Sequence, residues 1–516
     1  MKSIKNIKYK IKNCLLLFSV LFALSCSNWL DGALPKDKNL ADQQFSTERN
    51  IHSVLNGIYW ALADGNLYGS KLTMTEIELL AHYYYFNPNI TQSLYSGYEH
   101  FLYMSNYNWT DTDIKNSLAG IWSKAYKTIF EINNFIERLD ESTVISDEKK
   151  NVFLGEAYGL RAFLHFDLFR LFGSEAQDIP YNQSAEVIPH PPIPAEEFYD
   201  LLLEDIDKAL LLLKNDPILT IGIKDLTSDD AAETSTADIF TSYLRNYRMN
   251  YYAVQALKAR ILMYKGDVQE AGNLALNIIT TAFGDYKVDG KPFYWADKTK
   301  IEEEENRNYI FYEEVIFGIH NSNLYSRWKN YTGGTAYGNT YAVHLNNLQG
   351  NIFKNDNVSG SSISLWEDVR SKQWILSAIG GLQYVSCKYA EFPISTNNPK
   401  QYFQPLIRVA ELYYIVAEAR IRNGRVSDAI GWLNNFRVQR GMQYESLPTP
   451  ESVSELLAYS ILETEYYKEF YGEGQAYFYL KRQKSNTVFN VESANTYNQL
   501  PANAFIIPLP DDELDN

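Results

Sequence analysis

The chain has 516 residues and a formal net charge of −16. This acidic balance repels phosphate backbones, and no basic cluster follows Lys12, which argues against nucleic acid as a partner. Aromatic residues make up 15% of the chain, with 40 tyrosines. This is more than a core of this size needs from side chains that carry a polar end, and tyrosine-rich surfaces suit recognition.

The first 26 residues differ in composition from all that follow. A lysine-rich start precedes an apolar run over residues 14–24, and Ser25 and Cys26 come next. A run of 11 residues is too short to span a bilayer, which takes about 20, so residues 1–25 are predicted to be a removable signal peptide. A small residue before a cysteine is typical of the site where a bacterial peptidase cleaves and lipid is attached. We therefore expect lipid on Cys26 and a tether over residues 26–40. The alternative is an ordinary signal peptide in which Cys26 is incidental.

The remaining cysteine is predicted to be unpaired. If Cys26 carries lipid and Cys14 leaves with the signal peptide, Cys387 has no partner for a disulfide. We expect Cys387 to be a buried, inert thiol. No later apolar stretch is long enough to span a membrane, so the rest of the chain is predicted to be a soluble body.

Apolar residues at helical spacing predict the first helices. Residues 122–136 and 157–171 show this spacing and are expected to form an antiparallel pair. A third helix should begin after Pro194, because Glu196 and Glu197 would lie in its first turn, where acidic side chains suit the helix dipole. It should continue to about Leu213.

Two later segments superpose without gaps when they are aligned on Gly266 and Gly424. Each reads as a helix, a glycine turn and a second helix, with small residues where the helices must approach closely. This pattern is typical of tetratricopeptide units, although any helical hairpin with a glycine turn could show it. Tandem units recur about every 34 residues, whereas these glycines are 424 − 266 = 158 positions apart, so long insertions must interrupt the helices.

The sequence therefore predicts a mostly α fold, a tetratricopeptide-like helical hairpin scaffold with long irregular insertions that carry a few short strands, such as 314–320. The candidate insertions are residues 83–113, 214–242 and 283–401. We expect an N-terminal helical part over 41–282, a mainly irregular ligand-binding insertion over 283–401 and a C-terminal helical part over 402–516. Function should lie in the insertions.

Motifs for catalysis are absent from the sequence. The seven histidines are scattered, and there is no His-Glu-x-x-His, Cys-x-x-Cys, Gly-x-Ser-x-Gly or phosphate-binding loop. We predict no enzyme activity, no catalytic residue, no metal ligand and no cofactor, with calcium left open. A catalytic site assembled from distant residues also stays open. His165, in an apolar helix, is expected to be a core residue bonded to a neighbour, and the carboxylate runs 302–305 and 511–513 to be solvated.

Two aromatic clusters in the insertions are the best candidates for a binding site. Flat rings can stack on the apolar faces of sugars or on peptide side chains, while amide and guanidinium groups supply hydrogen bonds. The predicted stacking residues are Tyr107, Trp109, Trp295, Trp328 and Tyr331, with Asn108 and Arg327 as polar neighbours. Most aromatic residues of the two clusters should nonetheless pack the loops against the helices.

Several segments in order resemble the SusD/RagB outer-membrane lipoproteins of nutrient-uptake systems. Asn-Trp-Leu-Asp at 28–31 with Pro35 resembles the start of that family, and residues 155–173, with Arg-Ala-Phe-Leu-His-Phe-Asp-Leu-Phe-Arg-Leu-Phe-Gly at 161–173, resemble its most recognisable helix. Residues 259–267 and 408–419 resemble its paired repeat helices, and Pro-Leu-Pro-Asp-Asp-Glu-Leu at 508–514 resembles its C-terminal motif. The segment 469–474 keeps the family's Glu-Phe and Glu-Gly pairs. Ala476 and Tyr479 replace the commonest Arg and Asp at positions that we expect to pack helices.

The resemblance implies a lipid-anchored protein of the outer membrane, facing the extracellular side. Such a protein captures oligosaccharides and delivers them to a partner SusC-like TonB-dependent transporter. A peptide-binding relative of the RagB type is the main alternative, and a surface hydrolase or a scaffold that binds protein partners is a weaker one. The segment after Cys26 lacks the acidic run associated with surface export, so that motif does not support surface display.

Overall fold

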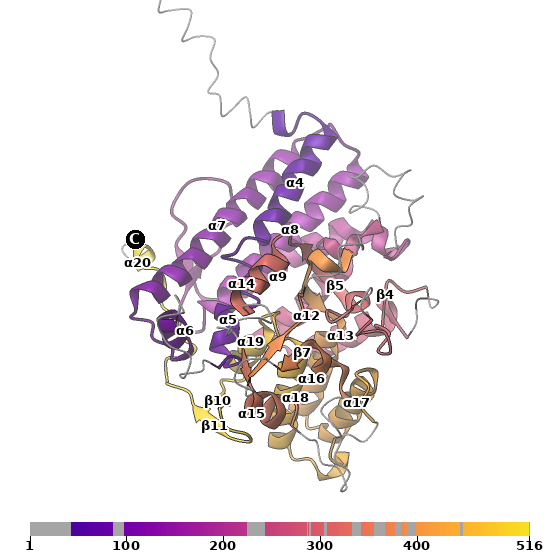
Figure 1. The fold of residues 1–516 in the computed structure, drawn as a ribbon. Helices are drawn as coiled ribbons and strands as arrows, with labels where there is room; N and C mark the ends of the chain where they lie inside the picture. Colours follow the sequence, from indigo (N-terminus) through magenta and orange to yellow (C-terminus); the bar gives the residue numbers. More distant parts are fainter. Residues whose placement is uncertain are drawn as a thin grey trace, which may run out of the picture.

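The computed structural model describes residues 43–85, 98–223, 243–285, 287, 290–303, 307–332, 342–354, 367–376, 383–390, 399–443 and 447–514. The predicted signal peptide, Cys26 and the tether lie outside these ranges. Helices dominate the described chain, as predicted (Figure 1). They are α4 (Glu48–Leu62), α5 (Glu76–Leu80), α6 (Tyr98–Ser105), α7 (Thr112–Asp140), α8 (Asp147–Leu171), α9 (Ala195–Leu212), α12 (Tyr251–Lys265), α13 (Val268–Ala282), α14 (Leu324–Thr332), α15 (Leu345–Asn347), α16 (Val409–Arg422), α17 (Val426–Gln439), α18 (Glu455–Glu469), α19 (Gln475–Arg482) and α20 (Asp511–Leu514).

The three helices predicted in the N-terminal half are confirmed. Helix α7 is longer than predicted at both ends, and α8 begins ten residues earlier than predicted and ends at Leu171 as predicted. The side chain of Asp111 caps α7 by accepting hydrogen bonds from the backbone of Asp113 and Ile114, and Ser146 caps α8 in the same way. Helix α9 begins after Pro194. Helix α8 is buried along almost its whole length because α7 and α9 both pack against it.

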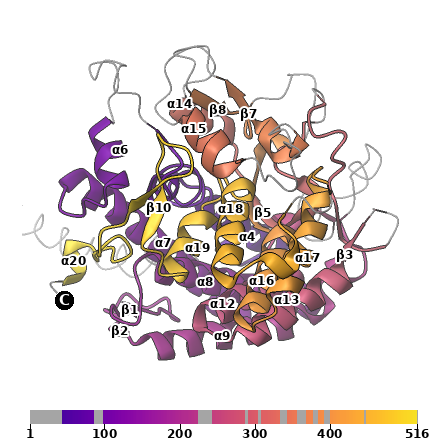
Figure 2. The ribbon, with the colours of Figure 1, turned by 90° about the horizontal axis from the view of Figure 1, so that it is seen from below.

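The predicted hairpins with glycine turns are also confirmed. Helices α12 and α13 meet at Gly266, and α16 and α17 meet near Gly424, and both glycines have the left-handed backbone conformation that favours glycine. A β-carbon added to Gly272 of α13 would lie 2.6 Å from Cβ of Ala419 on α16. Small residues therefore allow the two hairpins to approach closely. Figure 2 shows α12, α13, α16 and α17 side by side.

Strands in the described ranges are short, as expected for irregular insertions. They are β1 (Ile179–Pro180), β2 (Pro192–Ile193), β3 (Phe283–Gly284), β4 (Phe293–Tyr294), β5 (Val315–His320), β6 (Val343–His344), β7 (Trp374–Leu376), β8 (Gln383–Ser386), β9 (Phe403–Arg408), β10 (Thr487–Phe489) and β11 (Tyr497–Gln499). The predicted strand over 314–320 is β5, with Glu314 in the 3-10 turn before it. It pairs antiparallel with β9, and His320 lies opposite Phe403.

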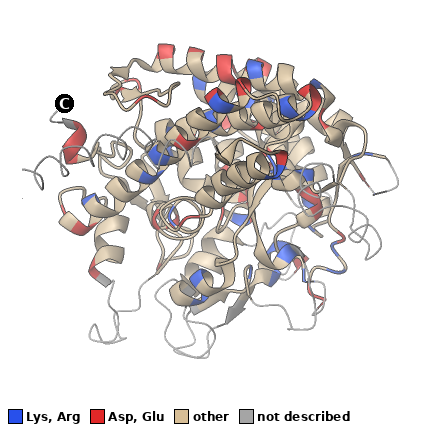
Figure 3. Ribbon diagram, turned by 90° about the horizontal axis from the view of Figure 1, so that it is seen from above, with Lys and Arg blue, Asp and Glu red and all other residues tan. Residues whose placement is uncertain are grey.

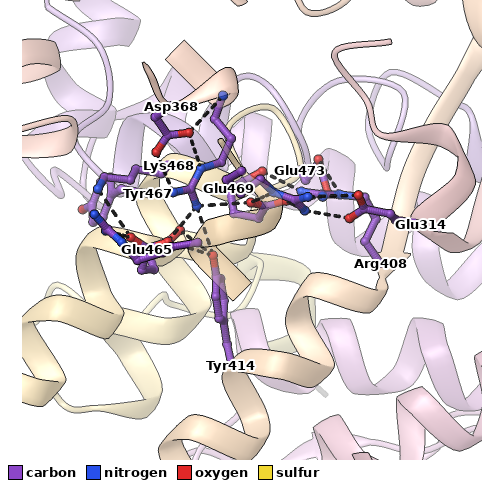
Figure 4. Close-up of polar contacts among 12 residues, drawn as sticks. Glu314, Asp368, Arg408, Tyr414, Glu465, Tyr467, Lys468, Glu469 and Glu473 are labelled. Carbon is purple, nitrogen blue, oxygen red and sulfur yellow. Dashed lines mark hydrogen bonds and ion pairs between the residues drawn. The ribbon is translucent and has the colours of Figure 1, made fainter. Parts of the chain in front are cut away.

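A network of buried ion pairs holds the C-terminal helices to the insertion (Figure 4). At its centre the Glu469 carboxylate accepts hydrogen bonds from Arg440, Arg408 and Arg370 at 2.5–3.2 Å. Burial alone would raise the pKa of Glu469, but the guanidinium groups of Arg440 and Arg408 lower it below its usual value. The carboxylate therefore stays charged although it is inaccessible to water.

The segment 469–474, which keeps the family's Glu-Phe and Glu-Gly pairs, has a structural role. Glu473 accepts hydrogen bonds from Arg408 and Lys388, and the backbone N–H groups of Gly472 and Gly474 donate to Glu78 of α5. Ala476 and Tyr479 are buried, and the ring of Tyr479 stacks on Tyr466. Both are helix-packing positions, as predicted.

The expectations for His165 and Cys387 are confirmed. His165 is fully buried, its Nδ1 donates to the carbonyl of Arg161, and its Nε2 accepts from the backbone of Asn182. Burial lowers the pKa of His165 to about 3. Cys387 is buried, and burial raises the pKa of its thiol to about 11, which keeps it protonated and unreactive.

The neutral state of His165 predicts a loss of stability in acid. The folded pKa of about 3 lies below the unfolded value of about 6.5, so the unfolded chain binds the extra proton and stability falls as the pH drops below about 6.5. Between pH 7 and pH 5 this residue alone should cost about 2 kcal/mol. Urea unfolding at both pH values should show a smaller pH dependence for His165→Gln than for the wild type. An equal dependence would contradict a buried neutral imidazole.

Two glycines with the same backbone conformation predict different costs of substitution. Gly424 and Gly474 both have φ of +73°, but an added β-carbon has nothing within 4 Å at Gly424 and meets the carbonyl oxygen of Leu72 at 2.3 Å at Gly474. Gly424→Ala should lower the free energy of unfolding by about 1–2 kcal/mol through backbone strain. Gly474→Ala should cost about 1–3 kcal/mol more, because the carbonyl must move. Equal losses in urea unfolding would mean that the contact with Leu72 relaxes freely.

Candidate functional site

The predicted site residues near the start of α7 are largely buried. Trp109 is 7% exposed, its indole N–H donates to the carbonyl of Asn503 at 2.9 Å, and its ring meets that of Tyr107 edge-on. Tyr107 is also buried and donates its hydroxyl hydrogen to the carbonyl of Leu80. The half-buried Asn108 accepts a hydrogen bond from Thr110. These contacts attach the start of α7 to its neighbours.

The predicted residues on α14 lie at a second place. Trp328 is 8% exposed and belongs to a small apolar cluster with Leu324 and Phe403. Arg327 donates to the carbonyl of Ala63, after α4, and Tyr331 accepts a hydrogen bond from Ser70 at 2.8 Å. Helix α14 is thereby held against the turn that follows α4.

Trp295 lies at a third place, against the repeat helices. Its ring contacts Phe283, Tyr413 and Phe436, and the Arg440 guanidinium lies 5.5 Å from the ring centre. The structure thus does not bring the predicted residues together into one site. It gives Tyr107, Trp109, Trp295 and Trp328 packing contacts, because their rings fill space between elements, and a ligand-binding role for them stays a prediction.

The described surface has a hollow of about 390 Å³ between α4, β5 and the 3-10 turn η5 (Arg245–Tyr247). We call it the Trp60 pocket, and it is lined by Asn56, Tyr59, Trp60, Tyr247, Arg248 and His320. Trp60 is 69% exposed. Its position follows from the pattern of α4, in which Ile51, Leu55, Ile58 and Leu62 face the core and Trp60 projects from the opposite side.

The lining of the Trp60 pocket combines a buried phenol with a guanidinium group. Tyr59 donates to Glu156 at 2.7 Å and accepts from the backbone of Met249. Burial, and then the Glu156 charge, raise the pKa of Tyr59 well above its usual value, so the hydroxyl stays neutral. The Arg248 guanidinium lies 4.3 Å from the centre of the Tyr59 ring and donates to Asn56. Arg248 is therefore positioned by both neighbours.

The lining of the Trp60 pocket also includes Tyr247 and His320. The Tyr247 ring lies 4.2 Å from that of Phe403 on β9, and the His320 ring at the end of β5 lies 5.4 Å from Tyr402. Partial burial lowers the pKa of His320, which favours the neutral imidazole at pH 7. Trp60, Phe130, Tyr402 and Tyr497 are the exposed aromatic side chains within the described ranges. Two of them, Trp60 and Tyr402, thus lie in or beside this pocket.

Buried polar groups fix the backbone of the Trp60 pocket. Arg245 is fully buried and donates to Asp216 and Glu156. The side chain of Asn250 donates to carbonyls of Arg245 and Ile316, and so joins η5 to β5. Such contacts hold the pocket side chains on rigid elements, which favours binding without reorganisation.

The chemistry of the Trp60 pocket suits binding better than catalysis. Its lining offers aromatic faces, an amide and a guanidinium group, and it has no nucleophile paired with a base. In the parts of the chain that the structure covers, no group of three or more His, Cys, Asp or Glu side chains is arranged to hold a metal ion. None of the helices described here has both the length and the apolar composition to cross a bilayer.

The residues of the Trp60 pocket were not among the sequence-based candidates. Aromatic composition singles out residues in the insertions, whereas Trp60 lies on a helix. A usable signal was present, because Trp60 falls on the polar side of an amphipathic helix, where a large ring has no core to pack against. Arg248 and His320 gave no such signal, because only the folded chain brings them to α4.

The chain is similar to known proteins along most of its length. A family model described as "Starch-binding associating with outer membrane" matches residues 28–223, and the model of the SusD family matches residues 241–505. SusD-like protein P38 of Formosa agariphila is 26% identical over 333 residues, which are 62% of this chain and 62% of that protein. The match therefore spans less than two thirds of that relative's length.

Solved structures share the fold at low sequence identity. A SusD superfamily protein from Bacteroides thetaiotaomicron has a TM-score of 0.64 and 20% identity, with 91% of this chain and 98% of that chain covered. Surface glycan-binding protein A from Bacteroides uniformis has a TM-score of 0.59 and 17% identity, with 91% and 98% covered. These similarities show that the mostly α, SusD-like fold predicted from the sequence is present.

The different exposure of Trp60 and Trp109 predicts losses of stability of very different size. Trp60→Ala should change the free energy of unfolding by no more than about 0.5 kcal/mol, because the side chain is 69% exposed. Trp109→Ala should cost about 3–5 kcal/mol, because it leaves a cavity and an unpaired carbonyl at Asn503. Urea unfolding of both variants tests this, and a large loss for Trp60→Ala would show that its ring is part of the core.

Proposed function

Since this chain belongs to the SusD family, we propose that it is a carbohydrate-binding protein of the outer membrane whose Trp60 pocket receives a sugar ring. The observation that carries this proposal is the Trp60 side chain, a large aromatic ring that is 69% exposed on rigid backbone beside a hollow. The family description and the glycan-binding neighbour support the same ligand class.

The side chains of the pocket match the two kinds of surface that a sugar presents. The indole face suits the apolar C–H face of a pyranose ring, and the amide of Asn56 and the guanidinium of Arg248 can hydrogen-bond to hydroxyl groups at its edge. Tyr59 and Arg248 are already fixed by buried contacts, so binding loses little side-chain entropy.

We further propose that lipid on Cys26 anchors the protein to the outer membrane, that the body faces the extracellular side, and that it delivers oligosaccharides to a SusC-like TonB-dependent transporter. The signal-peptide pattern before Cys26 and the outer-membrane association of the family support this arrangement. The protein would act by binding alone, because its pocket lacks paired catalytic groups. If radiolabelled lipid precursor labelled Cys26→Ala as strongly as the wild type, the anchor would lie elsewhere.

Carbohydrate binding predicts a specific loss on removal of the Trp60 ring. In calorimetry against a panel of oligosaccharides and peptides, the wild type should bind at least one oligosaccharide. Trp60→Ala should then weaken that binding by on the order of 1 kcal/mol or more, because a stacking ring is lost. Tyr497→Ala is the matched control, since Tyr497 is also an exposed aromatic residue, at 42%, on β11. Binding of peptides only would favour the RagB-like alternative, and products released from the sugars would indicate a hydrolase.

A further inference from the structure

A second hollow continues from the Trp60 pocket along the surface between α4 and α7. This α4–α7 groove has a volume of about 730 Å³ and is lined by Asn50, Ser53 and Gly57 of α4 and by Lys127, Phe130 and Asn134 of α7, among others. Trp60 lines both the groove and the pocket. The two hollows therefore meet at one exposed ring.

The groove has the shape and polarity for a chain of polar units. On its α4 side, Gly57 leaves open space, because an added β-carbon would have nothing within 4 Å. Asn50 and Ser53 line this side, and Asn134 of α7 lines the other. Phe130, which is 41% exposed, offers a second apolar face. A ligand that stacks on Trp60 can thus extend along the groove, where it would meet polar side chains and the ring of Phe130.

The charge of this surface is opposite to that of the chain. Lys124 and Lys127 line the groove with one carboxylate, Glu131, and Arg248 lines the pocket with none. Asp64 lies 3.7 Å from Lys124 and neutralises part of its charge. Elsewhere in the described chain both signs are interspersed along the helices (Figure 3), and the whole chain carries −16. A local excess of cations attracts anionic ligands, whereas the rest of an acidic protein repels them.

We infer that the Trp60 pocket and the α4–α7 groove form one continuous site for a linear acidic oligosaccharide, one that carries carboxylate or sulfate groups. One sugar stacks on Trp60, and the anionic groups of neighbouring sugars lie at Lys124 and Lys127 on one side and at Arg248 on the other. The inference rests on the proposed carbohydrate-binding function and adds the charge and the linear extent of the ligand.

The test compares matched acidic and neutral probes by calorimetry. Hexamers of 1,4-linked uronic acids are paired with their carboxyl-reduced forms, and sulfated hexasaccharides with their desulfated forms. At least one acidic hexamer should bind more tightly than its neutral counterpart, and its affinity should fall as the salt concentration rises. The acidic trimer should bind more weakly than the hexamer, because it cannot reach both hollows. The two arms separate carboxylate from sulfate recognition.

Variants locate the effect on the groove. Lys127→Gln and Lys124→Gln should each weaken binding of the acidic hexamer by about two- to fivefold, as expected for partly exposed ion pairs, and should weaken binding of the neutral hexamer by a smaller factor. Lys484→Gln is the control, because the Lys484 side chain is 82% exposed and does not line either hollow. Trp60→Ala should weaken binding of both hexamers.

The outcomes separate this inference from the proposed function. If no acidic hexamer binds more tightly than its neutral form, or if both lysine variants bind it as the wild type does, the acidic-ligand inference is overturned. Binding of neutral hexamers that depends on Trp60 would still support carbohydrate binding in the pocket. If Trp60→Ala binds every probe as tightly as the wild type, both the continuous site and the proposed pocket are wrong.

Discussion

The buried ionic network around Glu469 is the interaction on which the C-terminal half of the molecule depends. A lone carboxylate in this position would cost several kcal/mol, but Glu469 meets three guanidinium groups, and Glu465 and Glu314 accept from Arg370, Arg437 and Arg440. The partners come from η7 (Tyr312–Glu314), η11 (Val369–Gln373), β9, α17 and α18. Arg370 also pairs with Asp368 at the start of its own turn, and Lys468 pairs with Glu465 within α18. The contacts of Glu469 and Glu314 with Arg408 and Arg440 all join different parts of the chain, so these parts must assemble together. The insertion is thereby fixed to the repeat helices without a large sheet of its own.

This network also positions the candidate site, through the β5–β9 pair. Arg408 is the last residue of β9 and is held by Glu469 and Glu473. The register of β9 then sets the end of β5, where His320 enters the Trp60 pocket. On the other side, Glu156 accepts from both Arg245 and Tyr59 and so connects η5 with α4. The pocket therefore lies between two buried charge clusters, and its side chains stand on backbone that has little freedom to move.

The helical framework could be predicted from the sequence because its signals are local. Helix periodicity, the acidic first turn of α9 and the left-handed glycines at 266 and 424 each depend on a few neighbouring residues. The site could not be predicted in the same way. An aromatic residue in a polar loop gives the same local pattern whether its ring packs inward, as Trp109 and Trp328 do, or outward. Burial is decided by distant segments, as when Asn503 meets Trp109, and only Trp60 carried a local sign of exposure.

Perturbed pKa values, which often mark functional sites, do not single out this one, because the shifts of Tyr59 and His320 in the Trp60 pocket are matched by shifts throughout the core. Shifted groups in the core include Glu469, Arg440 and His165, which have almost no exposed surface and are hydrogen-bonded to one another or to the backbone. Their hydrogen bonds and ion pairs hold elements together, so these groups are not available to a ligand. The Trp60 pocket and the α4–α7 groove instead present a neutral ring, amides, two lysines and Glu131 along their surface, with the buried Arg248 in the pocket lining. A surface of this kind can recognise a polar chain by stacking and by hydrogen bonding, so the buried ionic groups stabilise the fold while the exposed ring, amides and lysines remain for contact with a ligand.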